Sequence, residues 1–149
     1  MKKIIVLSLA LLTTTILVGQ NGKQFILNNK ADLEYSLPDG AIRDTISLEE
    51  IILADSLVNK YVLENHAKYS WTRRVENYYE YHRQYAGYRT ETPEKAIFIN
   101  AFFLQPKEVM SQYLKETLIS YKGGGSNFFT IKVNLKTQTC FDLMVNAPK

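Results

Sequence analysis

The chain has 149 residues, with 18 lysines and arginines, 15 aspartates and glutamates, and a single cysteine. One cysteine excludes an intrachain disulfide, so an apolar core must hold the fold by itself. The net charge of +3 is no argument for a nucleic-acid partner, because Lys2 and Lys3 lie in a segment that we expect to be removed, which leaves +1.

The N-terminus has the pattern of a secretory signal peptide over residues 1–19. A positively charged start is followed by an apolar run over residues 4–18 and by the small residue Gly19. The run is too short and too interrupted to span a hydrocarbon core of ~30 Å comfortably. We expect cleavage after Gly19 or after Gln20, and therefore an exported protein, periplasmic or extracellular, that does not span a membrane.

Residues 20–46 have the weakest pattern, and we expect an extended arm laid on the domain. A short strand is expected over residues 23–27. Residues 36–40 predict a turn, because proline presets φ and glycine accepts positive φ. The remainder, residues 47–149, is expected to form one α+β domain.

One main helix is predicted from Ser47 to about residue 65 or 66. Ser47 and Glu50 form a capping box, in which each side chain can bond the backbone N–H of the other residue. Apolar side chains then recur at helical spacing and form one stripe: Leu48, Ile51, Ile52, Val58 and Val62. This stripe predicts a helix that packs on a sheet.

A tyrosine-rich strand is predicted over residues 77–88. Alternation with a period of two places aromatic residues mainly on one face and polar residues mainly on the other. The first face comprises Tyr79, Tyr81, Arg83, Tyr85 and Gly87. The second face comprises Tyr78, Glu80, His82, Gln84, Ala86 and Tyr88.

Three further strands are predicted after it. Residues 95–103 are apolar on both faces, which is typical of a central strand, and residues 129–135 and 140–145 alternate as a hairpin. In the second hairpin strand, Phe141, Leu143 and Val145 are predicted to share a face. A short helix is expected over residues 106–115 and a glycine-rich loop over 123–127. The predicted fold is α+β, one main helix packed on a four-stranded, mainly antiparallel sheet.

Residues 18–20, 81–88 and 124–135 resemble small exported, uncharacterised proteins of Bacteroidetes with a cystatin-like or nuclear-transport-factor-like α+β fold. The resemblance covers roughly the second half of the mature chain, and it implies no assigned activity. Cystatins also carry Gln-x-Val-x-Gly in the first hairpin after the helix. Here Gln84-Tyr-Ala-Gly87 lies at a comparable place, one residue shorter and without the valine.

Two groups of residues are candidates for ligand binding. Arg83 shares a face with Tyr81 and Tyr85, so its guanidinium either meets an anionic ligand framed by tyrosine hydroxyls or extends to solvent over the sheet. Trp71, in a basic and aromatic segment, either stacks on a ligand ring or fills the core at a helix end.

The outer face of the sheet is the third candidate. Phe98, Phe102, Phe128 and Met144 are predicted to point away from the helix, and a monomer rarely exposes such a patch. Either the arm covers these side chains, or a second copy of the chain does so in a homodimer, or another protein binds there.

The sequence contains no catalytic constellation, and its two histidines have no further ligands at metal-site spacing. We therefore expect no catalytic residues, metal or cofactor. The leading hypothesis is a non-enzymatic exported domain that binds a protein or envelope partner through its sheet or loops. The alternatives are a small-molecule-binding pocket protein of nuclear-transport-factor-like type and a cystatin-like protease inhibitor.

Overall fold

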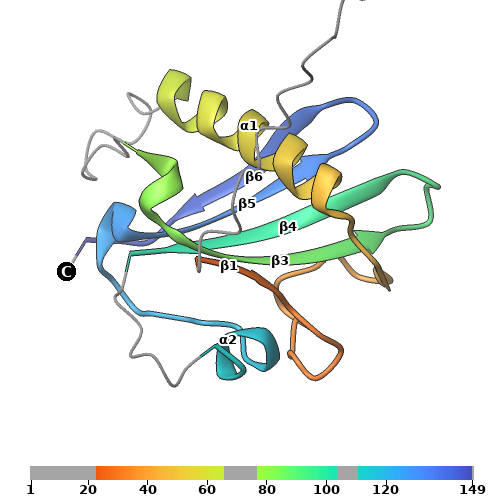
Figure 1. The fold of residues 1–149 in the computed structure, drawn as a ribbon, viewed down its shortest axis with the longest axis horizontal. Helices are drawn as coiled ribbons and strands as arrows, with labels where there is room; N and C mark the ends of the chain where they lie inside the picture. The colour runs from red at the N-terminus through yellow and green to blue at the C-terminus, as the bar shows by residue number, and fades with distance from the viewer. Residues whose placement is uncertain (1–22, 66–76, 104–110, 149) are drawn as a thin grey trace, which may run out of the picture.

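The computed structural model describes residues 23–65, 77–103 and 111–148, which form an α+β fold with one main helix on a mixed sheet (Figure 1). The predicted signal peptide, Trp71 and the first half of the short helix expected over residues 106–115 lie outside these ranges. Within them, no helix is both long enough and apolar enough to cross a membrane.

The sheet has six strands rather than the predicted four. They are β1 (Gln24–Ile26), β2 (Ile42–Asp44), β3 (His82–Arg89), β4 (Lys95–Phe102), β5 (Phe128–Asn134) and β6 (Thr139–Val145). Strands β3 to β6 pair antiparallel in chain order. The two additional strands come from the arm.

Both arm strands pair with the same edge of β3. Strand β1 runs parallel to its first half, with Gln24 opposite Arg83, and β2 runs antiparallel to its second half, with Ile42 opposite Arg89. Each has only three residues, which is too short for alternation to distinguish a strand from a loop. The arm is therefore part of the sheet as well as a cover over it.

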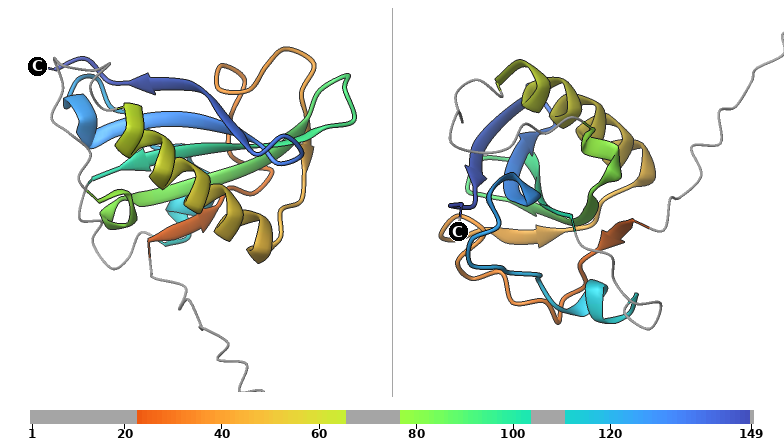
Figure 2. Two further views of the ribbon diagram at one scale, coloured as in Figure 1. Left: turned by 90° about the horizontal axis from the view of Figure 1, so that it is seen from above. Right: turned by 90° about the vertical axis from the view of Figure 1, so that its left-hand side faces the viewer.

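Helix α1 (Leu48–Asn65) lies along one face of the sheet (Figures 1 and 2). The capping box is confirmed, because Ser47 N donates to Glu50 Oε2 at 2.8 Å and Glu50 N donates to Ser47 Oγ at 3.2 Å. The buried side chains are Ile51, Ala54, Asp55, Val58 and Val62. Leu48 and Ile52 are half-exposed instead, because the buried stripe follows three- and four-residue spacing from Ile51.

The core between α1 and the sheet contains the side chains that the alternation assigned to that face. It includes Tyr81, Tyr85, Ile97, Ile99, Ala101, Phe129, Ile131 and Val133. The predicted strand faces of β3, β4 and β5 are thus confirmed.

The tyrosine strand begins later than predicted. Residues Tyr78–Glu80 form a 3-10 turn, η2, capped by the Asn77 side chain, which accepts a hydrogen bond from Tyr79 N at 3.1 Å. The turn breaks the alternation, so Tyr78 is fully buried beside Phe129 and Tyr79 is half-exposed. The predicted faces of these two tyrosines are therefore wrong.

The hairpin of β5 and β6 is confirmed, but a bulge interrupts it. Thr130 pairs with Met144 and Lys132 pairs with Phe141, so two residues of β6 lie opposite one residue of β5. Asp142, in the bulge, has a φ of 50°. As a result Phe141 packs on the outer side, and the prediction that it shares a face with Leu143 and Val145 is wrong.

The arm and a later segment cover the outer face of the sheet (Figure 2). Leu27 and Leu33 of the arm pack around Phe98. Phe25, together with Leu114 of the single-turn helix α2 (Tyr113–Glu116), packs around Phe102 and Phe128. The arm alternative is thus confirmed for the phenylalanines, whereas Met144 is 69% exposed. The glycine-rich loop ends in a 3-10 turn, η4 (Gly125–Asn127).

Replacing Gly87 with alanine is expected to destabilise the fold by about 2 kcal/mol. An added Cβ would lie 2.5 Å from Ile46 Cγ2 and 2.6 Å from Asp44 O, because the arm crosses β3 closely there. Chemical denaturation measures the change. Adding Ile46→Ala should restore only part of the loss, since the backbone contact remains. An unchanged denaturation midpoint for Gly87→Ala would contradict the close approach.

Candidate functional site

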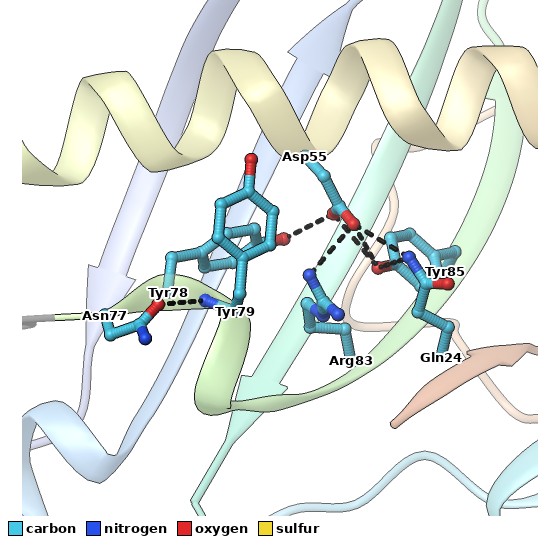
Figure 3. Close-up of polar contacts among 7 residues, drawn as sticks. All are labelled: Gln24, Asp55, Asn77, Tyr78, Tyr79, Arg83 and Tyr85. Atoms are coloured by element: carbon cyan, nitrogen blue, oxygen red, sulfur yellow. Dashed lines mark hydrogen bonds and ion pairs between the residues drawn. The ribbon is translucent and has the colours of Figure 1, made fainter. Parts of the chain in front are cut away.

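A buried carboxylate, Asp55 of α1, is the centre of a polar network between the helix and the sheet (Figure 3). Its Oδ1 accepts hydrogen bonds from Tyr78 Oη at 2.8 Å and Tyr85 Oη at 3.0 Å. Its Oδ2 accepts from Arg83 Nη1 and from Gln24 Nε2, each at 2.9 Å. Four segments of the chain, α1, η2, β3 and β1, therefore meet at one side chain.

The geometry is that of an ionised carboxylate. Every partner of Asp55 is a hydrogen-bond donor, and a charged guanidinium lies at ion-pair distance. Burial raises the pKa of Asp55 above its usual value, while Arg83 and the hydrogen bonds from Tyr78 and Tyr85 oppose that shift. Burial and the neighbouring carboxylate also raise the pKa values of both tyrosines, so they remain protonated donors.

Arg83 is only 1% exposed, and its guanidinium is held inside the molecule. Its guanidinium carbon lies 5.2 Å from the ring centroid of Tyr78 and 5.5 Å from that of Tyr79. Its Nε is buried without a hydrogen-bond partner in the described part of the chain. Arg83 therefore does not extend to solvent, and the anion that it meets is Asp55 of the same chain.

Among the other predicted site residues that the structure describes, Tyr85 belongs to this network, whereas Tyr81, Phe98 and Phe102 make contacts outside it. Tyr81 Oη donates to the carbonyl of Ser126 at 2.8 Å, and its ring packs edge-on against Phe129. Phe98 and Phe102 are buried under the arm and α2. Their burial removes the exposed patch that suggested a homodimer through this face.

A second polar group lies on the outer face of the sheet. Gln84 Nε2 donates to the carbonyls of Leu114 and Thr117, each at 2.7 Å, while its Oε1 accepts from Asn100 Nδ2 and Ile119 N, each at 2.9 Å. These bonds fix the segment around α2 to the sheet. The stretch that resembles the cystatin motif is thus in the middle of β3, where Gln84 is fully buried.

His82 occupies a third kind of environment, between two aromatic rings. It stacks on Phe102 at 5.5 Å and on Phe25 at 6.3 Å between ring centroids. Burial lowers the pKa of His82, and the charges of Lys23 and Arg83 lower it further. Its Nδ1 is buried without a hydrogen-bond partner in the residues described, so a second ring proton would have no acceptor there.

Two adjoining concavities lie where the arm meets the sheet edge. The larger, of about 530 Å³, is formed by the arm itself between Asn29 and Arg43. The smaller, of about 240 Å³, lies between the ends of β1 and β2 and is also lined by Asn29 and Arg43. We call this pair the arm pocket. Exposed Tyr35 and Ile42 belong to the same segment.

Neither the Asp55 network nor the arm pocket was predicted from the sequence. The position of Asp55 carried a signal, because it lies four residues after Ile51 and three before Val58 on the buried stripe. A charged residue on an apolar helix face needs a buried partner, and Arg83 on the aromatic strand face was the matching candidate. The arm pocket carried no comparable signal.

In the part of the chain that the structure describes, no three histidine, cysteine or acidic side chains gather into a group that could hold a metal ion. Cys140 is partly buried against the helix-side core, and burial raises the pKa of its thiol to about 11.

Comparisons with protein-family models, curated proteins and solved structures found no match to this chain.

Asp55→Asn is expected to lower the free energy of unfolding by about 3–5 kcal/mol, because it leaves the Arg83 guanidinium buried without a counter-ion. Urea denaturation measures the loss. The double variant Asp55→Leu, Arg83→Met should recover much of it, since neither charge then remains. As a control, Lys60→Ala in the exposed pair with Glu64 should leave the midpoint unchanged.

His82 is expected to make the fold less stable in acid. Its folded-state pKa is lowered, so the unfolded chain binds the proton first, and the free energy of unfolding falls as pH drops below about 6.5. The slope from this group is at most about 1.4 kcal/mol per pH unit. His82→Phe keeps an aromatic ring in the stack and should lose this slope. Parallel stability curves for the wild type and the variant between pH 5 and 7 would contradict the assignment.

Proposed function

We propose that the chain is an exported, non-enzymatic binding domain that holds its partner at the arm pocket and the loop around it. The observation that carries the proposal is the concavity of about 530 Å³ in the arm, together with the exposed side chains on the same segment. Tyr35 is 94% exposed and Ile42 is 73% exposed. Ile42 lines the concavity, and Tyr35 follows the lining residue Glu34 in the chain. An exposed tyrosine with an apolar neighbour is a typical anchor of a protein interface.

The closed state of the Asp55 network supports a non-enzymatic role. Each oxygen of Asp55 already accepts from side chains of the chain itself, and the Arg83 guanidinium is taken up by Asp55 and two tyrosine rings. A catalytic acid or base must come within hydrogen-bond reach of a substrate. The best-connected titratable group therefore acts in stability, and recognition is assigned to the edge of the sheet.

The other hypotheses receive different support. A helix followed by four consecutive antiparallel strands, β3 to β6, is consistent with a cystatin-like relationship, which we retain as part of the proposal. Protease inhibition through residues 84–87 has less support, because Gln84 is buried and bonded within β3. A small-molecule role is favoured at the arm pocket rather than around Arg83.

Substitutions at the arm test the proposal directly. The mature chain, immobilised and exposed to envelope and soluble fractions of the source organism, is expected to retain a saturable partner. Tyr35→Ala and Ile42→Asp should weaken that binding at least about tenfold, because they remove exposed anchors without disturbing the core. Circular dichroism verifies that each variant is folded.

Met144→Asp is the matched control, since Met144 is similarly exposed but lies on β6 at the opposite edge of the sheet. It should bind like the wild type. Equal loss in all three variants, or retention in all three, would contradict recognition at the arm.

A further inference from the structure

The arm pocket contains an arginine, Arg43, that makes no ion pair with any of the described residues. Among the three arginines that the structure describes, Arg83 pairs with Asp55 at 2.9 Å and Arg89 pairs with Asp44 at 2.6 Å. Arg43, adjacent to Asp44 in the chain, has no carboxylate within ion-pair distance in the described residues. Asp44, the next residue on β2, already accepts a hydrogen bond from Arg89.

The guanidinium of Arg43 is held in place rather than free in solvent. Its Nη2 donates to the carbonyl of Leu27 at 2.6 Å, so the side chain bridges from β2 to the end of β1. Its Nε is buried without a hydrogen-bond partner in the described part of the chain. Partial burial lowers the pKa of Arg43, so the charged form loses part of its hydration without gaining a carboxylate at ion-pair distance among the described residues.

The surroundings of Arg43 have the size and chemistry of a small-molecule site. The two concavities that it lines, of about 530 Å³ and 240 Å³, together provide room for a compact organic ligand. The apolar walls of the larger one are Ala31, Leu33, Leu37 and Ala41. Asn29 also lines both spaces and supplies an amide to them.

We propose that the arm pocket binds a small organic carboxylate, whose anionic group pairs with Arg43 and whose apolar part lies against Leu33 and Leu37. This inference rests on the proposed function for the location of the site, and it adds the chemical class of the ligand. A carboxylate is the natural partner of a guanidinium that lacks one, because the pair forms charge-assisted hydrogen bonds.

The charges around the pocket favour one negative charge over two. Glu34 and Asp39 also line the larger concavity, so a phosphate dianion would meet two carboxylates and only one guanidinium. A monocarboxylate balances Arg43 alone. Its remaining polar atoms, if they are donors, can bond the carboxylates of Glu34 and Asp39.

The test is a titration of the mature chain with N-acetyl-leucine, followed through the Nε–Hε resonance of Arg43 and the backbone amides of residues 29–43. Saturable shifts confined to this set are expected. N-acetyl-leucinamide, which has the same shape without the charge, should bind at least about tenfold more weakly, and inorganic phosphate should not compete. Equal binding of acid and amide, or selective binding of phosphate, would overturn the inference.

Variants separate the arginine from the pocket. Arg43→Gln should abolish binding of the acid, and Lys136→Gln, a change to an exposed cation on the turn between β5 and β6, should leave it unchanged. Because Arg43 also holds Leu27, Ala41→Trp provides a second test that fills the pocket and leaves Arg43 in place. Acid binding that survives Ala41→Trp would overturn the location.

The outcome for the ligand class is distinguishable from that for the proposed function. If N-acetyl-leucine produces no shift while Tyr35→Ala still loses the partner, the carboxylate inference fails and the binding domain stands. If the acid binds and the arm variants retain every partner, the site is a small-molecule site and recognition of a partner at the arm fails.

Discussion

The ion pair between Asp55 and Arg83 is the interaction on which the architecture depends. It joins the only long helix described to the first central strand, and the hydrogen bonds around it extend to η2 and β1. Removing both charges from water is unfavourable, and the pair is stable there because tyrosine and glutamine donors complete the carboxylate. Replacing both charges with apolar side chains would change the net stability little, whereas leaving either charge buried without the other is costly, so placements of the helix that separate the pair are disfavoured. It fixes which face of α1 meets the sheet and where the arm enters it.

The outer face of the sheet follows a different principle. There the arm and the α2 segment replace solvent over a row of aromatic side chains, and buried amides of Gln84 and Asn100 hold the cover through backbone groups. The sheet is thus buried on both sides, by a helix on one and by irregular chain on the other. Irregular chain packs less completely than a helix or a strand where it reaches the edge of a sheet. The arm pocket lies at such a place, beside the edge of β3.

Periodicity predicted the parts of the fold that repeat a pattern over many residues. The helix with its capping box, the faces of β3 and β4, and the final hairpin are of this kind. Features that depend on one residue were not predictable. The 3-10 turn at Tyr78–Glu80 and the bulge at Asp142 each move neighbouring side chains to the opposite face of the sheet. Neither feature alters the hydropathy pattern from which the faces were predicted. The pairing of Arg83 with Asp55 was within reach, because each is the one charged residue on an apolar face. The arm pocket was not, since it is formed where residues 29–43 fold back on themselves without a repeating pattern.

The pairing of β1 with β3 has a consequence for how the chain reaches this structure. Gln24 near the start lies opposite Arg83 past the middle of the sequence, and β2 pairs with the far half of the same strand. The arm strands therefore cannot pair until β3 has formed. The entropy of closing these long loops must be overcome before the contacts stabilise the fold. Until then the aromatic row of the outer face has no cover. Docking of the arm is accordingly a late, long-range step of folding, and it completes the burial of the outer face.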